Sequence, residues 1–166
     1  YIKLIEAALE KGKQSLYLLP EIALTTQLIK RLQNYFGDKV LVYHSKYSVN
    51  ERVEIYGHVK ENKDKGKIVI GARSCIFLPF QDLGLIVVDE EHEATFKQFD
   101  PAPRYHARDA AVVLANIFQA NIILGSATPS VESYFNAVHS KYALVELHSR
   151  FGNVLTPEVE VVDIKT

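Results

Sequence analysis

The sequence of 166 residues contains a single cysteine, Cys75. One thiol cannot form an internal disulfide, and it cannot build a zinc site from cysteines. No apolar run approaches the roughly 18 residues of a membrane-spanning helix, and no signal peptide opens the chain. We therefore expect a protein of the reducing cytoplasm with no membrane partner.

An excess of charge of one sign is also lacking. The chain has 19 basic and 20 acidic side chains, for a formal net charge of −1. Net charge therefore gives no indication of nucleic-acid binding, and any such surface must be local. The composition is 48% apolar, and apolar runs alternate with charged stretches, which is typical of a single globular domain.

The phosphate-binding loop G-x-x-x-x-G-K-[ST] is absent from the sequence as well. The stretch EKGKQS at 10–15 has one glycine, and no Ser or Thr follows its lysine in the required register. The chain therefore has neither the backbone cradle nor the lysine that hold phosphates in this motif.

The chain does contain a regular alternation of apolar runs and helical patterns. Strands are predicted at 15–20, 39–44, 67–72, 83–90, 121–127 and 142–148, and helices at 1–13, 21–37, 50–66, 105–120 and 130–140. Strands rich in Val, Ile and Leu that alternate with helices predict an α/β fold. Its parallel sheet would be covered by helices on both faces.

Polar clusters follow five of these strands. They are Pro20-Glu21, His44-Ser45, Gly71 to Ser74, Asp89 to His92, and Gly125 to Pro129. The carboxyl ends of parallel strands lie along one edge, and open α/β sheets bind ligands outside that edge. The five clusters therefore predict one site, although strands that simply end in polar loops would look similar.

The strand at 83–90 ends in the tetrad Asp89-Glu90-Glu91-His92. Phosphoryl transfer needs a carboxylate for Mg²⁺, commonly through water, and a group that orients the attacking water. We assign Asp89 to the metal and Glu90 to the water, whereas Glu91 fits a surface position without a role. The competing interpretation is that Asp89 and Glu90 cap the next helix.

The next strand ends in GSATPS, residues 125–130, where Ser126 and Thr128 supply short hydroxyls. A plain turn with Ser130 as a helix cap is the alternative. DEEH followed by GSAT one strand–helix unit later resembles the second and third motifs of superfamily 2 helicases. In that resemblance His92 links the nucleotide site to the next strand, and Ser126 and Thr128 couple hydrolysis to DNA movement.

A wider resemblance covers nearly the whole chain. The segments LLPEIALTTQ, YHSKYSVNER, IVIGARSCIFLPFQDLGLIVVDEEHEATFKQ, PAPRYHARDAA and GSATPSVES are similar to the primosomal protein N′ family, the bacterial replication-restart DNA helicases. PRYHARD is the most specific of them, because generic superfamily 2 helicases lack it. The resemblance implies a RecA-like helicase lobe of the P-loop NTPase type. Residues 1–150 would form a partial first motor lobe, the ATP-binding domain, and 151–166 would lead toward the following domain.

The resemblance also implies an activity and partners. It predicts an ATP-dependent DNA helicase that reloads the replication machinery at stalled forks, with ATP and Mg²⁺ as cofactors. Its partners would be single-stranded and forked DNA, other primosome proteins and single-strand-binding protein. In this family the P-loop precedes a helix like YIKLIEAAL, so we expect a piece of a longer protein that lacks a strand near the middle of the sheet. Alone it would be inactive, and zinc would bind only outside it.

The resemblance assigns two sets of residues to DNA. Glu21, Gly71, Arg73 and Ser74 match segments that face single-stranded DNA. An aromatic-rich loop that senses DNA and signals to the ATP site matches Phe96, Lys97, Gln98, Phe99, Arg104, Tyr105, His106 and Arg108. Bases stack on aromatic faces, while Arg and Lys contact phosphates. Alternatively, the two phenylalanines pack in the core, and His106 and Arg108 begin a helix with Asp109 as dipole partner.

Three other functions stay open at this point. The chain could belong to another superfamily 2 DNA translocase, which would not need PRYHARD. It could be a metal-dependent hydrolase without a nucleotide, with Asp89, Glu91 and His92 as ligands. It could also be a non-catalytic interaction module whose carboxylates are structural.

Overall fold

The computed structural model describes residues 1–23, 25–44 and 46–148. The chain forms two compact units, Tyr1–Val131 and Glu132–Thr166. The first unit contains the sheet and the predicted site. Among the described residues, no helix has the length and apolar character needed to cross a bilayer.

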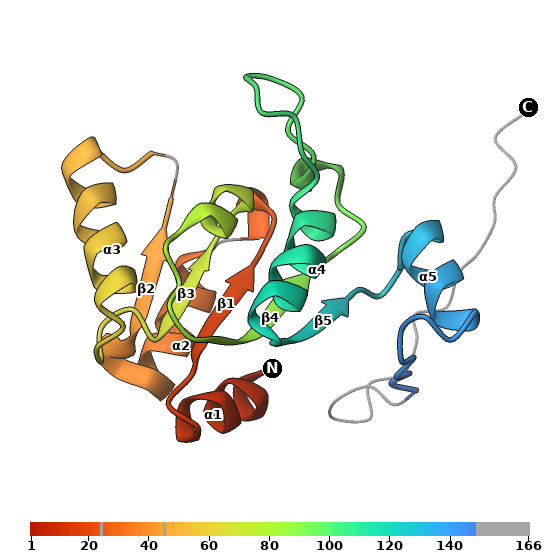
Figure 1. Cartoon of the computed structure of the whole chain (residues 1–166), viewed down its shortest axis with the longest axis horizontal. Coiled ribbons are helices and arrows are strands. Elements are labelled where there is room, and N and C mark those ends of the chain that lie inside the picture. Colours follow the sequence, from red (N-terminus) through yellow and green to blue (C-terminus); the bar gives the residue numbers. More distant parts are fainter. Residues whose placement is uncertain (24, 45, 149–166) are drawn as a thin grey trace, which may run out of the picture. The chain divides into compact units, whose positions relative to one another are not determined.

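The first unit is built on five parallel strands in the order β2-β3-β1-β4-β5 (Figure 1). Their bounds are Gln14–Leu18 (β1), Val40–Tyr43 (β2), Ile68–Gly71 (β3), Leu83–Asp89 (β4) and Asn121–Gly125 (β5). The predicted α/β parallel sheet is confirmed. The strands are contiguous, so a further strand could pair only beside β2 or β5, and the missing P-loop strand stays a prediction.

Helices cover both faces of the sheet, as predicted. They are α1 (Ile2–Glu10), α2 (Thr26–Phe36), α3 (Val49–Glu61) and α4 (Ala107–Phe118), while α5 (Val131–Val138) follows β5. Side chains alternate along a strand. Tyr17 and Leu19 therefore share a buried cluster with residues of α1 and α2, while Leu16 and Leu18 share one with residues of α3 and α4.

Two expected elements differ in the structure. The helix expected at 21–37 is a short 3₁₀ turn, Glu21–Ala23, followed by α2, because the Thr25 hydroxyl accepts the Leu28 N–H and starts a new helix there. The prediction of a strand at 142–148 is wrong, because these residues form no regular secondary structure. An alternating pattern makes a strand only where another strand offers a hydrogen-bonding edge. The passage predicted at 151–166 lies outside the described residues.

Candidate functional site

The carboxyl ends of β4 and β5 bring the two predicted motifs together. Asp89 and Gly125 are partners in the parallel register, and the Glu91 N–H donates to the Gly125 carbonyl at 3.0 Å. Glu90 adopts a left-handed backbone with φ 52°. This conformation is uncommon for a residue with a Cβ and persists where the surroundings hold it. The tight turn directs neighbouring side chains of the tetrad to different places.

Two tyrosine hydroxyls hold the carboxylate of Asp89. Tyr17, buried in β1, donates to Oδ2 at 2.9 Å, and Tyr1 donates to Oδ1 at 3.0 Å. Burial, followed by the charge of Asp89 and this hydrogen bond, raises the pKa of Tyr17 above its ordinary value. Both phenols therefore stay protonated and donate at any physiological pH. No sequence pattern had indicated Tyr17, since it reads as one more apolar position of β1.

Replacing Tyr17 by Phe tests this contact. The phenylalanine ring keeps the packing of the tyrosine ring, but Asp89 loses a hydrogen-bond donor that is shielded from water. Because a hydrogen bond to a charged group contributes more than a neutral one, we expect the free energy of unfolding to fall by about 1–2 kcal/mol. Urea unfolding of the 166-residue chain measures it.

The matched control is Tyr35→Phe on the surface of α2, where 59% of the residue is exposed. This change should stay within about 0.5 kcal/mol. Equal losses in the two variants would contradict a special role for the Tyr17 hydroxyl.

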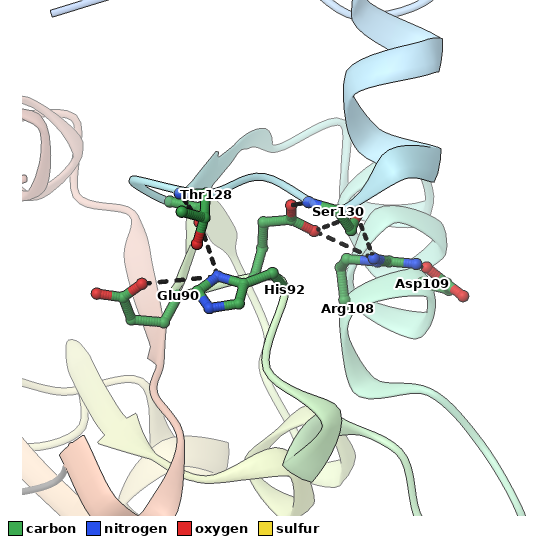
Figure 2. A network of polar contacts seen from close by, with 8 residues as sticks. Glu90, His92, Arg108, Asp109, Thr128 and Ser130 are labelled. Carbon is green, nitrogen blue, oxygen red and sulfur yellow. Dashed lines mark hydrogen bonds and ion pairs between the residues drawn. The ribbon is translucent and has the colours of Figure 1, made fainter. Parts of the chain in front are cut away.

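Glu90 and His92 lie on the side of the tetrad that faces the GSAT turn. The Nδ1 atom of His92 is 2.7 Å from the Ser126 hydroxyl and 3.7 Å from Oε2 of Glu90. The Ser126 hydroxyl also accepts the N–H of Thr128 at 2.9 Å. Figure 2 shows His92 between Glu90 and the turn that carries Thr128. The two motifs are therefore joined by a side-chain contact, and Glu90 remains accessible, with 46% of its side chain exposed.

Glu91 is the residue for which the sequence interpretation was wrong. It is 1% exposed, not a surface residue. Its carboxylate accepts the Ser130 N–H at 2.6 Å, the Ser130 hydroxyl at 3.0 Å and Nη1 of Arg108 at 3.1 Å. A buried carboxylate is tolerated when a cation and donors surround it. The only sign of this buried pair in the sequence was an arginine in the first turn of the following helix.

The predicted aromatic-rich loop is closed at its base. Lys97 and His106 form an antiparallel bridge, and the Gln98 N–H donates to the Tyr105 carbonyl at 2.8 Å. The loop stands out from the sheet in Figure 1, between β4 and α4. Next to this base, Phe99 is 64% exposed, and the Lys97 ammonium lies 4.8 Å from the centre of its ring. An exposed aromatic beside a cation can stack on a base and contact a phosphate.

The 3₁₀ turn after β3, Arg73–Phe77, contacts this loop. Arg73 donates to the Thr95 carbonyl at 3.0 Å, and the Phe77 ring packs edge-on against Tyr105 at 4.9 Å. The GARS segment and the aromatic-rich loop therefore pack against each other.

The structure divides the residues that were predicted to face DNA. Those at least partly exposed are Glu21, Arg73, Ser74, Lys97, Gln98, Phe99, Arg104, Tyr105 and His106. Phe96, Gly71 and Arg108 are buried instead, which departs from their expected exposure. Phe96 packs in the core, as the alternative interpretation had it. Several groups affect the pKa of His106, and burial, which has the largest effect, lowers it.

The metal-hydrolase alternative requires several ligands around one point. Among the described residues, no group of three or more His, Cys, Asp and Glu side chains could hold a metal ion. Glu91 and His92 contact different partners, Arg108 and Ser126 respectively. Hydrated Mg²⁺ is different, because it needs only one or two carboxylates besides phosphates and water. Asp89 fits that need, since none of the ion pairs of the described residues involves it.

A parallel sheet covered on both faces, with carboxylates and a Ser-Thr turn at neighbouring strand ends, fits the RecA-like helicase lobe that the resemblance implies. The DEAD/DEAH box helicase family model matches residues 1–136, and the chain belongs to this family.

Similar proteins share most of this chain. It is 41% identical over 165 residues to the replication restart protein PriA of Bacillus subtilis (strain 168) and 46% identical over 164 residues to that of Rickettsia conorii, with 99% of this chain covered in both. The chain spans 20% and 25% of the length of these two relatives.

A solved structure shows the same fold. The C-terminal domain of S. cerevisiae Dbp5 matches with a TM-score of 0.50 over 87% of this chain and 80% of that one, at 14% identity. At this identity the likeness concerns the fold alone.

Proposed function

We propose that the chain is part of an ATP-dependent DNA helicase that acts in replication restart. Residues 1–150 are a partial first motor lobe, and 151–166 lead to the following domain. The observation that carries the proposal is the 2.7 Å contact between His92 and Ser126, which joins the acidic tetrad to the GSAT turn at paired strand ends. Similarity to the replication restart proteins supports the choice of process.

Asp89 and Glu90 serve Mg²⁺ and ATP in this proposal. Asp89 would hold Mg²⁺ through water, which supplies charge neutralisation for the phosphates. Glu90, exposed at the sheet edge, would orient the attacking water. The phosphate cradle has to come from residues outside these 166, because the sequence has no G-x-x-x-x-G-K-[ST] motif. The chain alone therefore binds ATP weakly and does not unwind DNA.

The exposed residues of the aromatic-rich loop and the neighbouring turn would meet single-stranded DNA. Phe99 offers a face for base stacking, and Lys97 and Arg104 offer cations to phosphates. Arg73, held against Thr95, would lie at the same surface. Because the basic groups are local, the neutral overall charge does not oppose this role.

The test is ATP hydrolysis by the full-length protein that contains these residues, with and without single-stranded or forked DNA, next to the 166-residue chain. We expect hydrolysis only by the full-length protein and strong stimulation by DNA. A preference for forks over linear strands would distinguish a replication-restart helicase from another superfamily 2 translocase. Hydrolysis that ignores DNA would contradict the proposal.

A further inference from the structure

The buried pair of Glu91 and Arg108 is not used by the proposed chemistry. Arg108 stands in the first turn of α4. Its Nη1 donates to Glu91 at 3.1 Å and to the Ser130 hydroxyl at 2.7 Å, and its Nε donates to Asp109 at 2.8 Å (Figure 2). One guanidinium therefore ties together the turn after β4, the turn after β5 and the start of α4.

The charges of this group are held in place. Burial lowers the pKa of Arg108, but the hydrogen bonds and charges of Asp109 and Glu91 outweigh it and raise that pKa above its ordinary value. Arg108 is therefore cationic wherever the protein is folded. A planar guanidinium holds several acceptors at fixed angles, which a lysine cannot do.

Arg108 is also close to the base of the aromatic-rich loop. The bridge between Lys97 and His106 ends two residues before it, and His106 is the residue from which α4 starts. The loop base and Arg108 are therefore separated by only two peptide units. At the other end of the contact, Glu91 stands between Glu90 and His92.

The position of Glu91 makes it suited to fix its neighbours. Glu90 has a left-handed backbone that the surroundings must hold, and the anchored side chain of Glu91, with its N–H on Gly125, is next to it. Loss of the anchor frees the turn that aims Glu90 and His92.

We propose that the Glu91–Arg108 pair is the positioning contact through which the aromatic-rich loop sets the geometry of Glu90 and His92. The inference rests on the proposed function, and it gives Arg108 a role different from a DNA contact. It predicts that breaking the pair lowers the rate of hydrolysis on saturating DNA while DNA affinity is kept.

The experiment measures ATP hydrolysis by the full-length protein against the concentration of single-stranded DNA, together with the thermal midpoint. The variants are Glu91→Gln, Arg108→Gln, their double variant, and Arg108→Lys, which preserves the buried charge. Asp109→Asn is the matched control, because Asp109 also pairs with Arg108 but 63% of its side chain is exposed. Arg104→Gln provides the comparison for a DNA contact.

We expect each Gln variant to lower the DNA-saturated rate about tenfold, within the range of coupling between sites. The half-saturating DNA concentration should change less than about twofold, the DNA-free rate should fall by a smaller factor than the DNA-saturated rate, and the double variant should lose no more than either single one. Arg108→Lys should show a smaller loss in the same parameter, and Asp109→Asn should be close to wild type. Arg104→Gln should instead raise the half-saturating DNA concentration.

Two outcomes would overturn the inference. If Arg108→Gln raises the half-saturating DNA concentration as Arg104→Gln does, while Glu91→Gln does not, Arg108 contacts DNA. If the DNA-free and DNA-saturated rates fall by the same factor, together with the thermal midpoint, the pair only stabilises the fold. A failure of the proposed function is distinguishable from both, because the wild-type protein would then show no stimulation by DNA.

Discussion

Replacing Glu90 by Gln in the full-length protein should abolish DNA-stimulated ATP hydrolysis. The variant keeps the size of the side chain and its place at the end of β4, but its amide cannot accept a proton from water. Loss of a group that orients and deprotonates water lowers rates by about a hundredfold to ten-thousandfold. Steady-state phosphate release at saturating ATP and DNA measures the effect.

The fold should survive this change. Almost half of the Glu90 side chain is exposed, and its Oε2 atom lies 3.7 Å from Nδ1 of His92. An exposed pair of this kind contributes little to stability. ATP and DNA binding should therefore persist in Glu90→Gln, which separates a loss of chemistry from a loss of structure.

Glu93→Gln is the matched control, because it removes the same charge three residues further along, where the chain enters the next 3₁₀ turn. It should retain hydrolysis within about twofold, because the half-buried Glu93 side chain has no assigned role in the reaction. If hydrolysis survives Glu90→Gln, the role given to this carboxylate is wrong, and the interaction-module interpretation of the tetrad gains support. If Glu93→Gln loses as much hydrolysis as Glu90→Gln, the negative charge near the site matters more than the position of the Glu90 carboxylate.

The sheet could be predicted from the sequence because its signals are local. Aliphatic runs such as LIVV favour strands that are buried on both faces, and the polar residues after them mark the carboxyl ends of the strands. The meeting of the tetrad with the GSAT turn followed from that rule. The structure places His92 against Ser126, and the coupling role that the resemblance implied for these two residues stays a prediction.

The contacts that could not be predicted depend on tertiary distance. Glu91 and Arg108 are 17 residues apart and each would suit a solvated surface alone. Only their meeting makes both buried. Tyr17 is similar, because an alternating strand pattern cannot say that a phenol on β1 will reach Asp89 on β4. The predicted strand at 142–148 failed for the same reason, since pairing is a property of two segments.

Gly71→Ala should strongly destabilise the chain. Gly71 ends β3, paired with Tyr43 of β2, and a Cβ there would overlap the Tyr43 carbonyl oxygen and the sulfur of Cys75. The carbonyl belongs to the backbone of a neighbouring strand, so it cannot rotate away. Overpacking of this kind lowers the free energy of unfolding by about 1–3 kcal/mol. Because the partner is rigid, we expect a loss of about 3 kcal/mol. Urea unfolding of the 166-residue chain measures it.

Gly57→Ala is the opposite case and serves as control. Gly57 lies inside α3, and a Cβ there would meet nothing within 4 Å. Replacing a helical glycine by alanine raises the free energy of unfolding by about 0.5–1 kcal/mol, because the unfolded chain loses conformational freedom. Each variant adds one methyl group to the wild-type chain, yet the two changes in the free energy of unfolding should have opposite signs. If Gly71→Ala is as stable as wild type, close packing does not explain this glycine.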